Sequence, residues 1–115
     1  MVAYNVWLRD TPVEVTRAIA REVRTAHIRT LGLQVGEYTQ VSMNLVSPGD
    51  AGPMQAYDSV IECAARHGAG VAHAELVGLL PAAVLAGIPG GRWEELDLSE
   101  DRTIEARLAA AGISR

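Results

Sequence analysis

The sequence predicts an α+β fold in which one antiparallel sheet carries two helices on the same face. Four short segments alternate apolar and polar residues and contain β-branched or aromatic side chains, which is typical of half-buried strands. Two longer segments repeat apolar residues at helical spacing. Their order is β-α-β-β-α-β, the split-βαβ or ferredoxin-like arrangement, and two short helices are expected after it.

The first half of this pattern lies in residues 1–46. Residues 2–8 predict a strand, and Thr11 followed by Pro12 predicts the N-cap and first position of a helix that ends near residue 24. Residues 28–35 and 38–46 predict two further strands, joined by a tight turn at Gly36 and Glu37 into a hairpin.

The second half repeats the helix and strand. Residues 54–67 predict a helix with Tyr57, Ile61, Ala64 and Ala65 facing inward, and Gly68 ends it as the residue after the C-cap. Residues 71–76 predict the fourth strand, residues 81–85 a short helix, residues 92–98 an irregular bridge, and residues 101–111 the last helix. We expect a single domain over residues 1–115.

Composition excludes several classes of function. The chain has 115 residues, of which 49% are hydrophobic and 21% charged, as in a globular domain. Every basic residue is arginine, so neither a lysine Schiff base nor a phosphate-loop lysine is available. The net charge of −4 argues against a nucleic acid or an anionic membrane surface as partner.

The sequence also bears on cellular location and redox chemistry. Cys63 is the only cysteine, which excludes an internal disulfide and any paired-cysteine metal motif. No signal peptide is visible, and the apolar stretch of residues 76–88 is too short and too interrupted to span a bilayer. We therefore expect a cytoplasmic protein. Because a strand begins at residue 2, we expect a domain of a larger protein or one that works beside a partner.

The sheet face opposite the helices is the candidate functional surface. Strand alternation predicts that three apolar sets face the helices: Tyr4, Val6 and Leu8; Leu31, Leu33 and Val35; and Val41, Met43 and Leu45. The opposite face is then polar but almost uncharged, with one large aromatic residue. Its predicted members are Asn5, Trp7, Thr30, Gly32, Gln34, Gln40, Ser42 and Asn44, joined from the fourth strand by His73 and Glu75.

Amides and hydroxyls on such a face suit a partly desolvated interface or ligand groove, although an ordinary solvated face is the alternative. In particular, we expect Gln40, Ser42 and Asn44 not to be buried.

The remaining residues of the sequence favour no catalytic pair. His27, His67 and His73 show no metal-ligand spacing, Cys63 is expected to be a small core residue, and His67 is expected to complement the end of a helix.

Three stretches nevertheless resemble a known family. They are VAYNVWL at residues 2–8, TQVSMNL at residues 39–45 and AELVGLLP at residues 74–81, with LGL at residues 31–33 before the second. In this order they resemble the C-terminal half of the transferase domain of glutamate formimidoyltransferase (formiminotransferase). The most specific feature is the pairing of QVSxNL with LVGLxP about 30 residues later, and the resemblance covers nearly the whole chain.

The resemblance implies a function for the predicted open face. The family transfers the formimino group of N-formimino-L-glutamate to tetrahydrofolate during histidine degradation, and folate lies between two similar halves whose sheets face each other. It implies that Asn5, Trp7, Gln34, Gln40, Ser42, Asn44 and Glu75 are folate-facing candidates, with tetrahydrofolate as co-substrate. The family's catalytic histidine belongs to the N-terminal half, and none of the three histidines here matches it.

Two functions therefore remain open. The chain is expected to be a folate-lining half of a formimidoyltransferase that is inactive alone and meets an N-terminal half. The alternative is a stand-alone ferredoxin-like module that binds a second copy of itself, or another small ligand, through the same face. A further departure from the family is Trp7, where a smaller or polar residue is common; its ring could narrow the groove or stack on a pterin-like ring.

Overall fold

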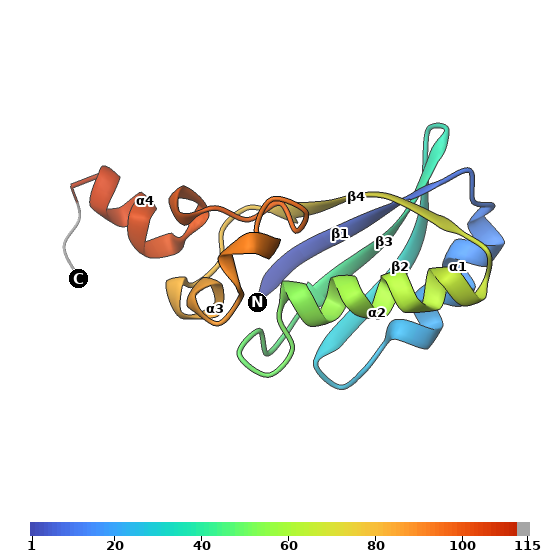
Figure 1. The fold of residues 1–115 in the computed structure, drawn as a ribbon, viewed down its shortest axis with the longest axis horizontal. Helices are drawn as coiled ribbons and strands as arrows, with labels where there is room; N and C mark the ends of the chain where they lie inside the picture. The colour runs from blue at the N-terminus through green and yellow to red at the C-terminus, as the bar shows by residue number, and fades with distance from the viewer. Residues whose placement is uncertain (113–115) are drawn as a thin grey trace.

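The computed structural model describes residues 1–112 and confirms the predicted ferredoxin-like α+β fold (Figure 1). The strands are β1 (Val2–Arg9), β2 (Ile28–Val35), β3 (Tyr38–Leu45) and β4 (Gly70–Val77). They form one antiparallel sheet in the order β2-β3-β1-β4, so β1 lies in the interior beside β3 and β4.

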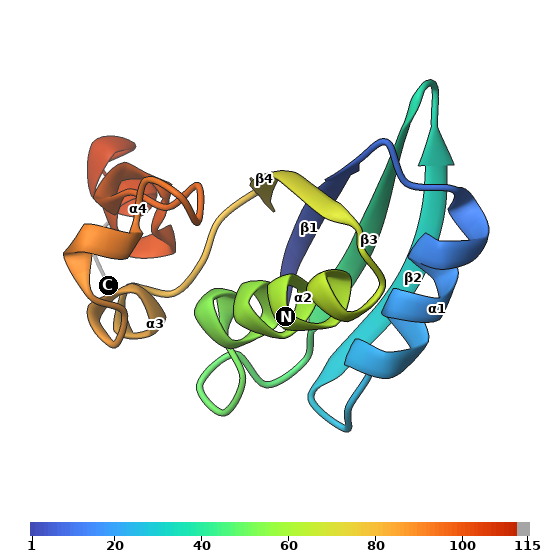
Figure 2. The same ribbon diagram turned by 45° about the vertical axis from the view of Figure 1, so that its right-hand side comes forward.

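Two helices cover one face of this sheet. Helix α1 (Val13–Val23) packs on β2 and β3, and α2 (Pro53–Arg66) packs on β4 and β1. Figure 2 shows both helices on the same side of the strands. The other face carries no helix of the described residues, which leaves the open face that the sequence predicts.

The remaining elements lie beyond one end of the sheet (Figures 1 and 2). They are α3 (Ala82–Ala86), the 3₁₀ turns Gly90–Arg92 and Glu100–Arg102, and α4 (Ile104–Ala110). Long-range hydrogen bonds tie this region to the sheet, among them that from Arg102 Nη2 to the Leu76 carbonyl at 2.6 Å. Tyr4 Oη donates to the Leu96 carbonyl at 2.7 Å, and the Leu76 amide donates to Asp97 Oδ2 at 2.9 Å.

The core lies between the helices and the sheet and follows the predicted alternation in β1 and β3. Tyr4, Val6 and Leu8 are fully buried, as are Val41, Met43 and Leu45. The predicted inward face of α2 is partly wrong: Ala64 is buried and Tyr57 packs half-buried against the core, but Ile61 and Ala65 are exposed, and Ala56, Val60 and Cys63 complete the buried stripe. No helix in residues 1–112 has the length and apolar character needed to cross a membrane.

The predicted cap of α1 is also wrong. Pro12 rather than Thr11 occupies the N-cap position, and no side chain caps the helix. The Thr11 hydroxyl instead donates to the Arg9 carbonyl at 2.8 Å, which fixes the turn between β1 and α1. At the other helix the prediction is confirmed, since Gly68 follows the C-cap His67 with φ of +68°, a conformation that favours glycine.

Strand β2 faces the opposite way from the prediction. Ile28, Thr30 and Gly32 are buried beneath α1, whereas Leu31 is 58% exposed. The reason is close packing: a methyl group at Gly32 would lie 2.8 Å from Arg17 Cα, so only glycine allows α1 to approach. The Thr30 hydroxyl also donates to the Ala20 carbonyl of α1. Leu31, Leu33 and Val35 therefore belong to the open face.

Candidate functional site

Strand register arranges the open face in rows that run across all four strands. Directly paired residues of antiparallel strands point to the same face, so each row can be followed from β4 to β2. The first row is Val77, Ala3, Asn44 and Arg29; the second is Glu75, Asn5, Ser42 and Leu31; the third is His73, Trp7, Gln40 and Leu33. Tyr38 and Val35 pair beyond the third row, at the hairpin end.

Six of the seven predicted site residues lie in these rows, and Gln34 does not. Gln34 pairs with the buried Thr39, which places it on the helix side of the sheet. Its side chain is exposed at the hairpin tip and donates to the carbonyls of Gly36 and Tyr38 at 2.8 and 3.2 Å. The assignment of Gln34 to the open face is therefore wrong, for the same reason that β2 is reversed.

Glu75 is the charged centre of the open face. Its Oε1 accepts hydrogen bonds from Asn5 Nδ2 at 3.1 Å and from Trp7 Nε1 at 3.0 Å. These two donors, first Asn5 and then Trp7, lower the pKa of the Glu75 carboxyl, although partial burial opposes them. The carboxylate is thus held ionised and oriented, while within residues 1–112 its Oε2 has no hydrogen-bond partner.

An aromatic pair lies beside this carboxylate. The rings of Trp7 and His73 stack with centroids 5.8 Å apart and planes inclined by 15°. A β-bulge between Trp7 and Leu8 interrupts the pairing of β1 with β4 at this point, and bulges commonly re-aim side chains next to functional sites. The result is a shallow hollow over the β1–β4 edge, lined by Trp7, Arg9, Tyr38, Ala72, His73 and Glu75.

Gln40 behaves differently from the prediction. It lies on the open face beside Trp7, yet it is only 7% exposed, so the expectation that it escapes burial is wrong. Larger neighbours in its row, Trp7 and Leu33, flank it from both adjacent strands. Among the described residues its amide has no hydrogen-bond partner, and the amide atoms keep slight contact with solvent. Ser42 and Asn44 are less buried, as predicted.

The open face also carries apolar side chains, two of which, Leu31 and Val35, were predicted to face the helices. Leu31, Val35, Tyr38 and Val77 are between 42% and 58% exposed. Three of these four residues belong to the β2–β3 hairpin, which makes the β2 edge and the hairpin end apolar, while Gln40, Ser42 and Asn44 keep the β3 row polar. Such a group of uncovered apolar side chains is typical of a surface that docks on another one.

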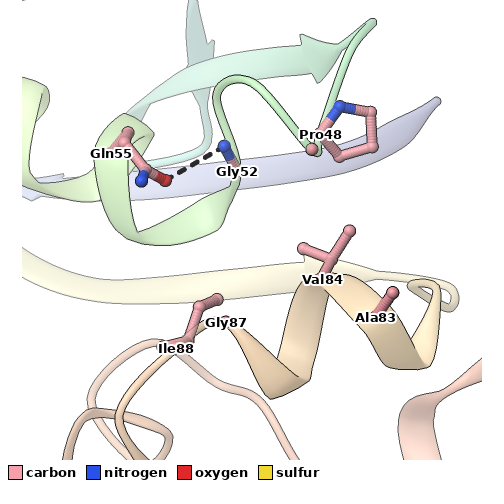
Figure 3. A pocket seen from close by; sticks show the side chains of 8 residues that line it. Pro48, Gly52, Gln55, Ala83, Val84, Gly87 and Ile88 are labelled. Atoms are coloured by element: carbon pink, nitrogen blue, oxygen red, sulfur yellow. Dashed lines mark hydrogen bonds between the residues drawn. The ribbon is translucent and has the colours of Figure 1, made fainter.

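A second hollow lies away from the open face, between the β3–α2 loop and α3 (Figure 3). Its lining residues are small or apolar apart from Gln55, and the Gln55 Oε1 atom accepts the Gly52 amide at 3.0 Å. No residue that lines it is charged or nucleophilic: they are Pro48, Gly49, Gly52, Gln55, Ala83, Val84, Gly87 and Ile88. This hollow therefore offers no catalytic chemistry.

In comparisons with known proteins, no protein-family model and no curated protein matches the chain.

Proposed function

We propose that this chain is the folate-lining half of a glutamate formimidoyltransferase-type assembly, whose open face meets a second sheet across a folate site. The observation that carries the proposal is the fixed Glu75 carboxylate on that face, held by Asn5 and Trp7. All three residues belong to stretches that carry the resemblance to the family, and they come together from β1 and β4.

The chemistry of this cluster suits a reduced pterin ring. A pterin presents N–H donors, and an ionised carboxylate oxygen is a strong acceptor for such a group. Glu75 Oε2 is available for such a donor, while the nearly buried Gln40 amide offers both a donor and an acceptor two strands away, on β3. Trp7 adds a broad apolar surface, one side of which already stacks on His73.

The chain supplies binding groups but no complete proton-transfer machinery. His73 is the one histidine among the described residues that lies on the open face, since His27 precedes β2 and His67 ends α2. The carboxylate of Glu75 does not orient His73, because its hydrogen bonds come from Asn5 and Trp7. We therefore expect a second polypeptide to supply the general acid or base.

Titration with a stable reduced folate such as 5-formyltetrahydrofolate tests the binding role. Calorimetry on the purified chain is expected to show saturable binding that weakens at least tenfold in Glu75→Gln. The matched control is Glu62→Gln, which changes an exposed carboxylate of α2. Absence of binding at millimolar folate, or equal weakening in both variants, would contradict the proposal.

A rate assay tests whether catalysis needs a second polypeptide. The isolated chain is expected to transfer no formimino group from formiminoglutamate to tetrahydrofolate, because general acid–base help is worth about 10²- to 10⁴-fold. Turnover by the purified chain that disappears in His73→Ala would contradict this expectation and make His73 the base.

The second candidate is self-association through the same face, and the exposed apolar residues of the β2–β3 hairpin favour it. A four-stranded face offers about 800 Å² per partner, the size of a standard specific interface. A two-fold dimer would present the same rows to each other. Light scattering across micromolar concentrations is expected to show a dimer that Trp7→Ala, Leu31→Arg and Ser42→Arg convert to monomer. A wild-type chain that stays monomeric at high concentration rejects this candidate.

A further inference from the structure

A carboxylate, a thiol and an imidazole meet on the helix side of the sheet, far from the open face. Glu22 lies in the last turn of α1, while Cys63 and His67 lie one turn apart at the end of α2. Glu22 Oε2 accepts from Cys63 Sγ at 3.2 Å and contacts His67 Nε2. All three ligand atoms lie within 4.8 Å of one another.

We propose that Glu22, Cys63 and His67 form a three-ligand site for a divalent transition metal such as Zn²⁺. In a tetrahedral zinc site with metal–ligand distances of about 2.0–2.3 Å, neighbouring ligand atoms lie roughly 3.5 Å apart. The observed separations reach that value with side-chain adjustments of about 1 Å. One sulfur, one nitrogen and one oxygen ligand leave a fourth position for water.

The ligand types favour one class of metal ion. Thiolate and imidazole favour zinc, cobalt and copper over the hard cations Mg²⁺ and Ca²⁺, which prefer oxygen ligands throughout. When the metal binds, the Cys63 S–H bond breaks and its proton passes to solvent, so thiolate and carboxylate together neutralise the two positive charges. The neighbouring Arg66, which opposes a cation, is itself paired with Glu62 at 3.2 Å.

The site has both a rigid side and an entry path. Cys63 is only 1% exposed and is fixed in the helix layer, whereas the side chains of Glu22 and His67 are 45% and 30% exposed. A hollow at this position is lined by Glu22, Val23, Thr25, Ser59, Glu62, Cys63 and Arg66. A metal there would clamp the end of α1 to the end of α2.

Cobalt spectroscopy tests the proposal directly. Because Cys63 is the only cysteine of the chain, a thiolate-to-cobalt charge-transfer band can arise from no other residue. Titration of the tag-free, reduced protein with Co²⁺ is expected to give this band with one equivalent, and Zn²⁺ is expected to bleach it. Cys63→Ser should abolish the band, while His67→Gln and Glu22→Gln should each weaken Co²⁺ binding at least tenfold.

The matched control is His73→Gln, which removes a histidine on the opposite face of the sheet and should leave the titration unchanged. Since His67 and Glu22 are partly exposed, their variants keep the fold even if Cys63→Ser does not. No charge-transfer band at millimolar Co²⁺, a band that survives Cys63→Ser, or Co²⁺ binding that is unaffected by both other substitutions would overturn the site. In those cases the three residues are only a hydrogen-bonded link between helices.

Discussion

Replacing Gly32 by alanine is expected to destabilise the protein markedly, because α1 lies directly against this residue. The new methyl carbon would lie 2.8 Å from Arg17 Cα and 2.9 Å from Arg17 N, where ordinary carbon contacts need about 3.5–4.0 Å. Both are backbone atoms, so the helix itself must move by roughly 1 Å. The hydrogen bond from Thr30 to the Ala20 carbonyl then weakens as well.

The magnitude follows from these contacts. Overpacking of a close-packed layer costs about 1–3 kcal/mol, and a lost hydrogen bond adds about 1 kcal/mol. The smaller conformational entropy of the unfolded alanine variant offsets about 0.4–1 kcal/mol. We therefore expect a net loss of about 2 kcal/mol, or roughly 8 °C in Tm for a domain of this size.

Urea denaturation followed by circular dichroism measures this difference. The matched control is Gly70→Ala at the start of β4, where the added methyl carbon meets only Arg9 Cβ at an ordinary 3.8 Å. That variant should stay within about 0.5 kcal/mol of wild type. If Gly32→Ala were equally harmless, the close approach of α1, and with it the orientation of β2, would be refuted.

Three further predictions concern single groups. Trp7→Phe removes a hydrogen-bond donor from Glu75 and should raise the pKa of that carboxyl. Ionised Glu75 stabilises the fold until the pH falls through the native pKa of the carboxyl. The urea midpoint of the variant should therefore begin to drop at a higher pH than that of the wild type. Tyr4→Phe leaves the Leu96 carbonyl without its 2.7 Å donor and should cost about 1–3 kcal/mol in urea, whereas a loss below about 0.5 kcal/mol would contradict this. Burial raises the pKa of the Cys63 thiol. A disulfide reagent should therefore modify Cys63 in the folded chain over tenfold more slowly than it modifies free cysteine, and urea unfolding should remove the difference. Equal rates in the folded chain would contradict the burial of Cys63.

The element order was predictable because local patterns and tertiary packing agree over most of the chain. In β1 the residues predicted to face the helices, Tyr4, Val6 and Leu8, are the buried ones, and burial alternates along the whole strand. In β3 the same rule holds for Val41, Met43 and Leu45. Gly68 ends α2 where its backbone conformation requires it. In each case the local sequence pattern fits a single backbone arrangement, and the structure has that arrangement.

Strand β2 shows where hydrophobicity alone misleads. Its more apolar side, with Leu31 and Leu33, faces outward because α1 approaches too closely for large side chains beneath it. A glycine inside a strand is itself a signal of close backbone approach, so Gly32 could have indicated the correct face. The misplacement of Gln34 follows from this one reversal. The Glu22–Cys63 contact spans 41 residues and leaves no local pattern at all.

The reversal of β2 changes what the open face can do. With Thr30 and Gly32 outward the β2 edge of the face would be polar, whereas the real face has a polar region around Glu75 on β1 and β4 and an apolar strip along β2 and the hairpin end. A polar ligand and an apolar docking surface can therefore occupy the same sheet side by side. It follows that Glu75→Gln should weaken folate binding without affecting dimerisation, and Leu31→Arg should do the opposite. Joint loss of both properties in either variant would show that ligand and partner share one site.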